Sequence, residues 1–366
     1  MTVSELKKTI QDCGVVGAGG AGFPTHLKID PRAKTILLNC AECEPLISVD
    51  RYLLTNYANE ILSALKQLSD VLDADVVVAV KKTYKNAIGS VKGIIDAYPR
   101  FRLGLLDAVY PVGDEVLLVH ETLGLIVPPG ALPIDIGCVV FNVETMYNIY
   151  NAMEFGRAVA VKWVTIAGEV ENPGVKRISI GTAIGDAVAT AGSLTVENPV
   201  YIINGLMMGI KASDADNITK TTNAIFVLPS HFFAKHTCES HGIDLKRAAS
   251  ACCQCRSCTD MCPRHLIGYP IEPHRIMRAL CAKDPASDSF YGVMYCSSCG
   301  VCEKIACPQN LKPRSLIVIF KEELKKAGVS SDKPGASSVS PMLRYRRVDA
   351  NRLLIRLGLA KYEVPV

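Results

Sequence analysis

The sequence of 366 residues contains no apolar run of the roughly 18–20 residues that a membrane-spanning helix requires. Its first residues, MTVSELKK, have no apolar core behind the lysines, so we expect no export signal. The formal net charge is only +4 and is spread along the chain, whereas nucleic-acid binding requires a concentrated basic surface. These absences predict a cytoplasmic protein that has no transmembrane segment and does not bind nucleic acid.

The rest of the composition is that of an ordinary folded protein. Hydrophobic residues make up 49% of the chain and charged residues 21%, which excludes disorder as the dominant state. The chain is long enough to bury a sizeable core, and its length predicts two or three domains of about 150 residues each.

Cysteine is the most informative residue type. Of the 15 cysteines, eight fall in two motifs between Cys252 and Cys307. A secreted disulfide scaffold would be short and would carry cysteines throughout its length. Concentration in one segment of a chain without an export signal therefore predicts metal ligation in a reducing compartment. We expect the isolated Cys13, Cys138, Cys238 and Cys281 to be packed thiols.

The two motifs are C-x2-C-x2-C-x3-C-P, at 252–263, and the same run with one extra residue before its last cysteine, at 296–308. In two-cluster ferredoxins the first three cysteines of such a run bind one [4Fe–4S] cluster and the fourth binds the other. Zinc sites, the main alternative, use pairs of cysteines instead. Cys253 is out of register and is expected to be a spectator. The predicted ligand sets are Cys252, Cys255, Cys258 and Cys307 for one cluster, and Cys296, Cys299, Cys302 and Cys262 for the other.

A glycine-rich segment, GAGGAGFPTHLK, occupies residues 17–28. Gly17, Gly19 and Gly22 satisfy the dinucleotide fingerprint G-x-G-x-x-G, but that fingerprint must lie between a strand and a helix. Here a helix is expected before it, at 4–11 with a serine cap, and FPT follows it. The pattern favours an anion-binding loop whose N–H groups approach a phosphate, with Lys28 adding positive charge, over a merely tight turn.

Strand-like and helix-like segments alternate after this loop, which predicts an α/β sheet with ligands at the carboxyl ends of its strands. Asn39 and Asn142 lie at two such ends. The pair Cys40-x2-Cys43 could be a redox or zinc pair, although packing at the sheet edge is favoured. The expected strands are 34–38, 76–80 and 138–141, and the expected helices lie near 52–72, 84–97, 115–123 and 143–153.

Four motifs resemble the flavin-binding subunit of respiratory complex I and, more closely, the C subunit of the Rnf complex and the cobalamin reductases of propanediol-utilisation microcompartments. These are GAGGAGFPTHLK, NCAECEP (39–45), YPVGDE (110–115) and FNVET (141–145). With the cysteine segment, the resemblance covers nearly the whole chain. It implies that the first domain binds FMN and takes hydride from NADH.

The resemblance also implies roles for individual residues. Pro31, Asp114 and Phe141 depart from the complex I pattern, and these departures affect the expectation of NADH binding more than that of FMN binding. The implied nicotinamide side comprises Gly20, Phe23, Glu44 and Glu115, with Glu44 and Glu115 as the catalytic candidates. The implied FMN contacts are Gly17, Gly19, Lys28, Asn39, Glu42, Tyr110, Gly113, Asn142 and Thr145.

The segment 157–230 predicts a small β-grasp-like unit with a turn at 172–174 and a helix capped near Thr182. It resembles the soluble-ligand-binding domain of this family, and we expect it to be a spacer that docks the ferredoxin domain. A Ser/Gly/Pro-rich linker at 330–341 precedes a tail whose leucines are expected to pack back on the body. A metal site formed by His231, His236 and His241 is disfavoured.

The predicted fold is α/β, with an FMN- and NADH-binding domain (1–156), the β-grasp-like domain (157–230), an α-helical dicluster ferredoxin-like domain (243–328) and a linker with a C-terminal strap (329–366). The predicted function is electron transfer from NADH through FMN and two [4Fe–4S] clusters to a protein or corrinoid enzyme, in a larger redox complex or a microcompartment. One alternative is an electron-input role like that of the Rnf C subunit. Another is an iron–sulfur adapter that does not oxidise NADH.

Overall fold

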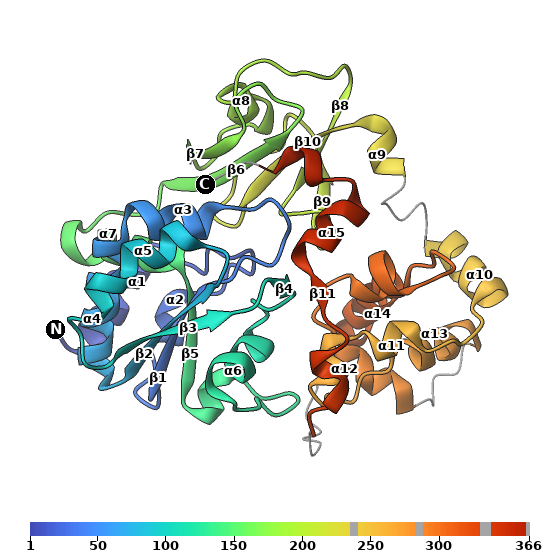
Figure 1. Cartoon of the computed structure of the whole chain (residues 1–366), viewed down its shortest axis with the longest axis horizontal. Helices are drawn as coiled ribbons and strands as arrows, with labels where there is room; N and C mark the ends of the chain where they lie inside the picture. Colours follow the sequence, from blue (N-terminus) through green and yellow to red (C-terminus); the bar gives the residue numbers. More distant parts are fainter. Residues whose placement is uncertain (235–240, 283–287, 330–337, 364–366) are drawn as a thin grey trace. The chain divides into compact units, whose positions relative to one another are not determined.

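The computed structural model describes residues 1–234, 241–282, 288–329 and 338–363 (Figure 1). The chain forms two compact units. The first comprises residues 1–125, 133–232 and 349–366, and the second comprises residues 126–132 and 233–348.

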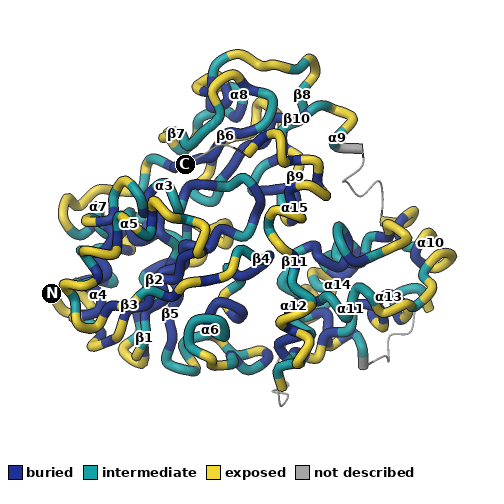
Figure 2. The backbone as a smooth tube through the Cα atoms, viewed as in Figure 1, coloured by how far each residue is buried: buried dark blue, intermediate teal, exposed yellow. Residues whose placement is uncertain are grey.

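The first unit contains a four-stranded parallel sheet in the order β3-β2-β1-β5. In its register Thr35 lies beside Asp75 on one side and Cys138 on the other. Strands β1, β2 and β5 are almost continuously buried because helices cover the sheet, as the dark blue tube in Figure 2 shows, whereas strand β3 has exposed residues. The strands are β1 (Thr35–Cys40), β2 (Asp75–Lys81), β3 (Phe101–Leu106) and β5 (Cys138–Asn142), while β4 (Val109–Tyr110) lies outside this sheet.

The helices follow the expected alternation, with two differences. The segment expected as one helix at 52–72 is two helices, because the chain leaves helical geometry at Tyr57 (φ −131°, ψ 34°). The first helix is capped by Thr2 through a capping box with Glu5, rather than by the serine that the sequence predicts. The helices are α1 (Val3–Asp12), α2 (Thr25–Lys28), α3 (Val49–Asn56), α4 (Ala58–Leu72), α5 (Lys85–Ile95), α6 (Glu115–Leu123) and α7 (Val143–Phe155).

A second sheet in the same unit has the order β7-β6-β10-β8-β9 and is antiparallel except for the β6–β10 pair. Its helix α8 (Ile184–Ala189) follows Ala183 without a side-chain cap, so the expected cap near Thr182 is wrong. The mixed sheet with one packed helix agrees with a β-grasp-like unit. The strands are β6 (Val161–Gly168), β7 (Gly174–Ser179), β8 (Pro199–Ile203), β9 (Ile210–Ala212) and β10 (Ala224–Pro229), followed by α9 (Ser230–Ala234).

The C-terminal helix α15 (Ala350–Leu357) belongs to the first unit and is capped by Asp349. Leu353, Leu354 and Leu357 are buried, so the prediction that these leucines pack back on the body is confirmed. His236 and residues 330–337 of the expected linker lie outside the described residues.

The described part of the second unit is helical, and three of its α-helices begin with proline at a position where no N–H is needed. One of its apolar clusters contains Ala248, Met277 and Leu316, and Ile276 and Ile317 are also fully buried. In the described ranges no helix has both the length and the hydropathy needed to cross a membrane. The helices are α10 (His241–Ala251), α11 (Ser257–Asp260), α12 (Pro263–Leu266), α13 (Pro273–Ala282) and α14 (Pro313–Lys326), with a π-helix at Val301–Ala306.

Candidate functional site

The glycine segment forms a closed loop between α1 and the single helical turn α2. The loop is held by hydrogen bonds from the Gly17 N–H to the Phe23 carbonyl (2.8 Å) and from the Gly22 N–H to the Gly17 carbonyl (3.2 Å). Gly20 and Gly22 have φ values of +106° and +65°, which residues with a Cβ atom rarely adopt. Because a helix precedes the loop, the dinucleotide fingerprint has the wrong context, as the sequence predicts.

Three of the predicted residues meet beside this loop. The Lys28 Nζ lies 2.8 Å from a Glu115 carboxylate oxygen, 3.0 Å from the carbonyl of Val140 and 5.9 Å from the centre of the Phe23 ring. Lys28 has 27% of its side chain exposed and Glu115 has 46%, so the ion pair is solvent-accessible and weak. A phosphate could therefore bind Lys28 without overcoming a strong internal pair.

Asn39 and Gly113 shape the carboxyl end of β1. The Asn39 side chain donates to the Gly113 carbonyl (2.9 Å) and accepts from the Ala41 N–H (3.0 Å). A Cβ at Gly113 would lie 2.2 Å from the Ala41 carbonyl oxygen, so only glycine fits there. The Gly113 N–H also donates to the Cys43 thiol (3.1 Å), and burial raises the pKa of this thiol to about 12. Cys43 is therefore a neutral packed thiol in this structure.

Buried carboxyl groups lie just after the carboxyl end of β1. Glu42 accepts from the Asp50 N–H (2.7 Å), and Asp50 accepts from the Glu144 N–H (3.2 Å). Burial, followed by the charge of a neighbouring carboxylate, raises the pKa of both Glu42 and Asp50. The second carboxyl oxygen of Glu42 is buried and has no hydrogen-bond partner among the described residues. Buried polar atoms normally have partners, so this oxygen fits a bound group whose polar atoms can hydrogen-bond a carboxyl group, as FMN has.

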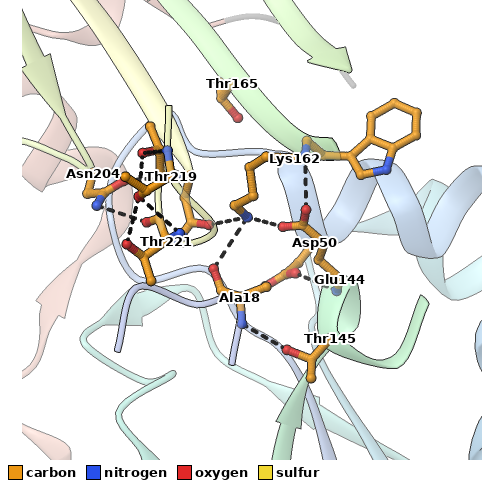
Figure 3. A network of polar contacts seen from close by, with 12 residues as sticks. Ala18, Asp50, Glu144, Thr145, Lys162, Thr165, Asn204, Thr219 and Thr221 are labelled. Carbon is orange, nitrogen blue, oxygen red and sulfur yellow. Dashed lines mark hydrogen bonds and ion pairs between the residues drawn. The ribbon is translucent and has the colours of Figure 1, made fainter. Parts of the chain in front are cut away.

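The β-grasp-like part also contributes to this region, which the expectation of a spacer did not include. The backbone N–H groups of Met207 and Met208 donate to the Glu44 carboxylate (3.0 and 2.7 Å), which is 6% exposed. Buried Lys162 on β6 reaches Glu144 and the glycine loop (Figure 3). The sequence signal for Lys162 is a single charged residue within the otherwise uncharged strand VKWVTIAG.

The remaining predicted residues take the following positions. Thr145, at the start of α7, accepts from the Ala18 N–H of the loop (3.0 Å). Asn142 is a hydrogen-bond partner of Asp50 and would collide with a Cβ at Gly19 (2.6 Å). Tyr110 is 4% exposed and precedes the Gly113 turn. The structure therefore gathers the predicted flavin-side residues around the glycine loop and the carboxyl ends of β1 and β5.

The eight motif cysteines lie near one another in two groups of four. Burial and then the neighbouring Cys252, Cys307 and Cys255 raise the pKa of Cys258 to about 12. Burial and then Cys296, Cys299 and Cys262 raise the pKa of Cys302 well above its ordinary value. Each group thus draws three cysteines from one motif and the last cysteine from the other, and the first group lines one cavity together with Cys253.

The loops that carry these cysteines have the geometry of N–H nests. Gln254, Arg256, Ser298 and Gly300 all have positive φ, which turns successive N–H groups toward the interior of a loop. Sulfur atoms accept hydrogen bonds from the Gln254 side chain (to Cys252, 3.2 Å) and from the backbone N–H groups of Ser298 (to Cys296, 3.3 Å) and Leu311 (to Cys307, 3.4 Å). Such donors stabilise the thiolates that iron–sulfur clusters require.

Comparison with known families matches three segments of the chain. Residues 10–151 match the Nuo51 FMN-binding domain, residues 163–211 match the SLBB domain, and residues 251–312 match the 4Fe-4S dicluster domain. The chain thus combines a flavin domain and an iron–sulfur domain, as expected of an electron-transfer oxidoreductase.

Curated relatives match over most of the chain. Cobalamin reductase PduS of Citrobacter freundii is 36% identical over 361 residues, which span 98% of this chain and 79% of the relative. Cobalamin reductase PduS of Salmonella typhimurium is also 36% identical, over 99% of this chain and 80% of the relative. The C subunit of the Na(+)-translocating ferredoxin:NAD(+) oxidoreductase complex of Acetobacterium woodii is 32% identical over 73% of this chain and 59% of its own length.

A solved structure shares the fold. The NAD+-reducing [NiFe]-hydrogenase in its H2-reduced state matches with a TM-score of 0.59 over 91% of this chain and 64% of the hydrogenase chain. The sequence identity is 20%, so this likeness supports the architecture and carries no residue roles.

Proposed function

This chain belongs to the cobalamin reductase PduS family, and from that premise we propose that it transfers electrons from NADH through FMN and two [4Fe–4S] clusters to a corrinoid acceptor. The family and the matched domains make the chain an oxidoreductase with flavin and iron–sulfur chemistry. The observation that carries the proposal is the combination, in one chain, of a flavin domain with two groups of four cysteines. The acceptor rests on the similarity to cobalamin reductases over 98% of the chain.

The residues of the first unit divide between phosphate binding and the flavin ring. The N–H groups of the glycine loop and the Lys28 ammonium bind the phosphate, with Glu115 releasing Lys28 for this purpose. The unpartnered carboxyl oxygen of Glu42 forms a hydrogen bond with a polar atom of the bound group. When bound, FMN supplies the exchange between two-electron hydride chemistry and one-electron transfer. Exposed Phe23 offers a stacking surface to the adenine of NADH. The family resemblance assigns Glu44 and Glu115 to the nicotinamide side.

The residues of the second unit hold the clusters. Cys252, Cys255, Cys258 and Cys307 bind one cluster, and Cys296, Cys299, Cys302 and Cys262 bind the other. In this arrangement the last cysteine of each motif binds the cluster held by the other motif. Each cluster therefore links the two motifs and stabilises both cysteine loops.

A second candidate is an electron-input component of a larger complex. The 32% identity to the C subunit of a ferredoxin:NAD(+) oxidoreductase complex supports this role. In either role we expect a protein or corrinoid-enzyme acceptor and a place in the cytoplasm or within a bacterial microcompartment.

The test uses full-length protein purified and reconstituted without oxygen. We expect about eight irons and eight acid-labile sulfides per chain, because two cubanes each hold four of both. NADH should bleach the flavin absorbance and then reduce added aquocobalamin in a spectrophotometric assay. If NADH does not bleach the flavin absorbance, NADH is not the electron donor. Bleaching without reduction of aquocobalamin, but with reduction of ferredoxin, would favour the second candidate.

A further inference from the structure

One lysine of the β-grasp-like sheet reaches the glycine loop of the flavin domain. Lys162 lies on β6, and its side chain is 1% exposed. Its ammonium group forms an ion pair with Glu144 and donates to the side-chain oxygen of Asn223 (2.7 Å) and to the carbonyl oxygen of Ala18 (3.4 Å) (Figure 3). Three acceptors thus surround the three N–H bonds of a fully buried ammonium group.

We propose that Lys162 is a positioning residue of the FMN site, which fixes the glycine loop in its phosphate-binding conformation and makes strand β6 of the β-grasp-like sheet part of that site. The inference rests on the proposed FMN binding and extends it to a residue outside the matched flavin domain.

The first argument is the geometry of one peptide group. In a planar trans peptide the C=O and the following N–H point in opposite directions. The Ala18 carbonyl points to the buried Lys162, so the Gly19 N–H of the same peptide points away from the protein interior. Ala18 is 3% exposed, whereas Gly19 and Gly20 are exposed. Lys162 therefore directs the Gly19 N–H outward, where a phosphate oxygen can accept it.

The second argument is that Ala18 is held from both sides. Its N–H donates to the Thr145 hydroxyl (3.0 Å), and its carbonyl accepts from Lys162. Thr145 and Glu144 are adjacent in the first turn of α7, and Glu144 also accepts from the Trp163 N–H of β6 (3.0 Å). The loop, the start of α7 and strand β6 are thus joined by one buried polar network.

The third argument concerns what flexibility would cost. The loop contains glycines in left-handed conformations, which lose much conformational entropy when they are ordered. If the loop is already ordered, phosphate binding does not have to include this entropy loss. The affinity is then higher without any new contact to the ligand. Lys162 achieves this although it touches no part of the expected ligand.

The test compares full-length protein carrying the double substitution Lys162→Met and Glu144→Gln with the wild type. Removing both charges avoids the large penalty of an unpaired buried charge, so the protein should stay folded and retain its iron. Lys176→Met, on neighbouring strand β7, makes the same change in a lysine that is not fully buried and is the matched control. Hydrogen–deuterium exchange of residues 17–22 is measured without flavin, and the FMN dissociation constant is measured by fluorescence quenching.

We expect faster exchange in residues 17–22 with unchanged exchange in α4, and an FMN dissociation constant raised about tenfold or more, from the loss of a charge-assisted hydrogen bond. The Lys176→Met protein should match the wild type in both measurements. Unchanged loop exchange, or faster exchange with unchanged FMN affinity, would overturn the inference. Wild-type protein that binds no FMN would instead overturn the proposed function, and the exchange data would still report whether Lys162 orders the loop.

Discussion

Lys321 places positive charge beside the cysteine group that contains Cys296. Lys321 on α14 donates to the Cys296 carbonyl (2.7 Å). Burial lowers the pKa of Lys321, while the nearby Cys296 acts in the opposite direction. A cation near an iron–sulfur cluster favours the reduced form, because that form carries more negative charge. We therefore expect the Lys321 side chain to raise the reduction potential of the cluster proposed at this cysteine group.

We predict that Lys321→Met lowers the reduction potential of the cluster on Cys296, Cys299, Cys302 and Cys262 by on the order of 60 mV, which is a tenfold change in a one-electron equilibrium. Redox titration followed by electron paramagnetic resonance measures this shift. Lys325→Met, one turn further along α14 and 51% exposed, is the control and should shift neither cluster appreciably. Equal shifts of both clusters would contradict a local electrostatic effect.

The residues that follow helix α15 attach it by hydrogen bonds to a sheet that is far away in the sequence. Glu169, directly after β6, accepts from the Lys361 ammonium (2.7 Å) and from the Tyr362 hydroxyl (2.6 Å), which follow α15. These hydrogen bonds, Lys361 first and Tyr362 second, lower the pKa of Glu169 to about 2. Lys361 is 63% exposed, so its part of the interaction is screened, whereas Tyr362 is buried.

The lowered pKa predicts how this attachment depends on pH. The ionised carboxylate stabilises the attached tail above its ordinary pKa of about 4.5, and this contribution is lost as the pH falls toward about 2. In limited proteolysis between pH 5 and pH 3, we expect cleavage in residues 350–362 to increase as the pH falls. Glu169→Gln should raise cleavage several-fold already at pH 5 and remove the pH dependence. Glu171→Gln, at an exposed neighbour, should behave like the wild type.

For the chain as a whole, the proposed path separates hydride acceptance in the first unit from electron exit in the second. Cys302→Ser should disable one cluster, because a hydroxyl is a poorer ligand for iron than a thiolate. The flavin domain needs no cluster to accept hydride. Anaerobic rapid mixing with NADH should therefore bleach the flavin of the variant at close to the wild-type rate, while aquocobalamin reduction should fall more than about tenfold.

Cys281→Ser is the matched control for this experiment. Cys281 lies on α13 of the same unit but outside both motifs, so its replacement should change neither rate. Loss of flavin bleaching in Cys302→Ser would show instead that the flavin site depends on an intact cluster.

The sequence by itself determined the features that depend on local spacing. The two cysteine motifs, the glycine loop and the alternating α/β segments are readable because each depends on residues close together in the chain. Parallel pairing of β1 with β2 and β5 follows from that alternation. The missed strand β3 carries only a partial apolar pattern, with Arg102 and Leu105 exposed.

Only the tertiary structure decided which polar groups meet in the interior. Lys162 reaches Ala18 across 144 residues, and Met207 reaches Glu44 across 163 residues. No local pattern encodes such pairs, since they join residues that lie far apart in the chain. The sequence alone shows that a lysine is unusual within a strand that carries no other charged residue. Its partners are set by packing, because a buried charge is stable only where the fold supplies acceptors for it.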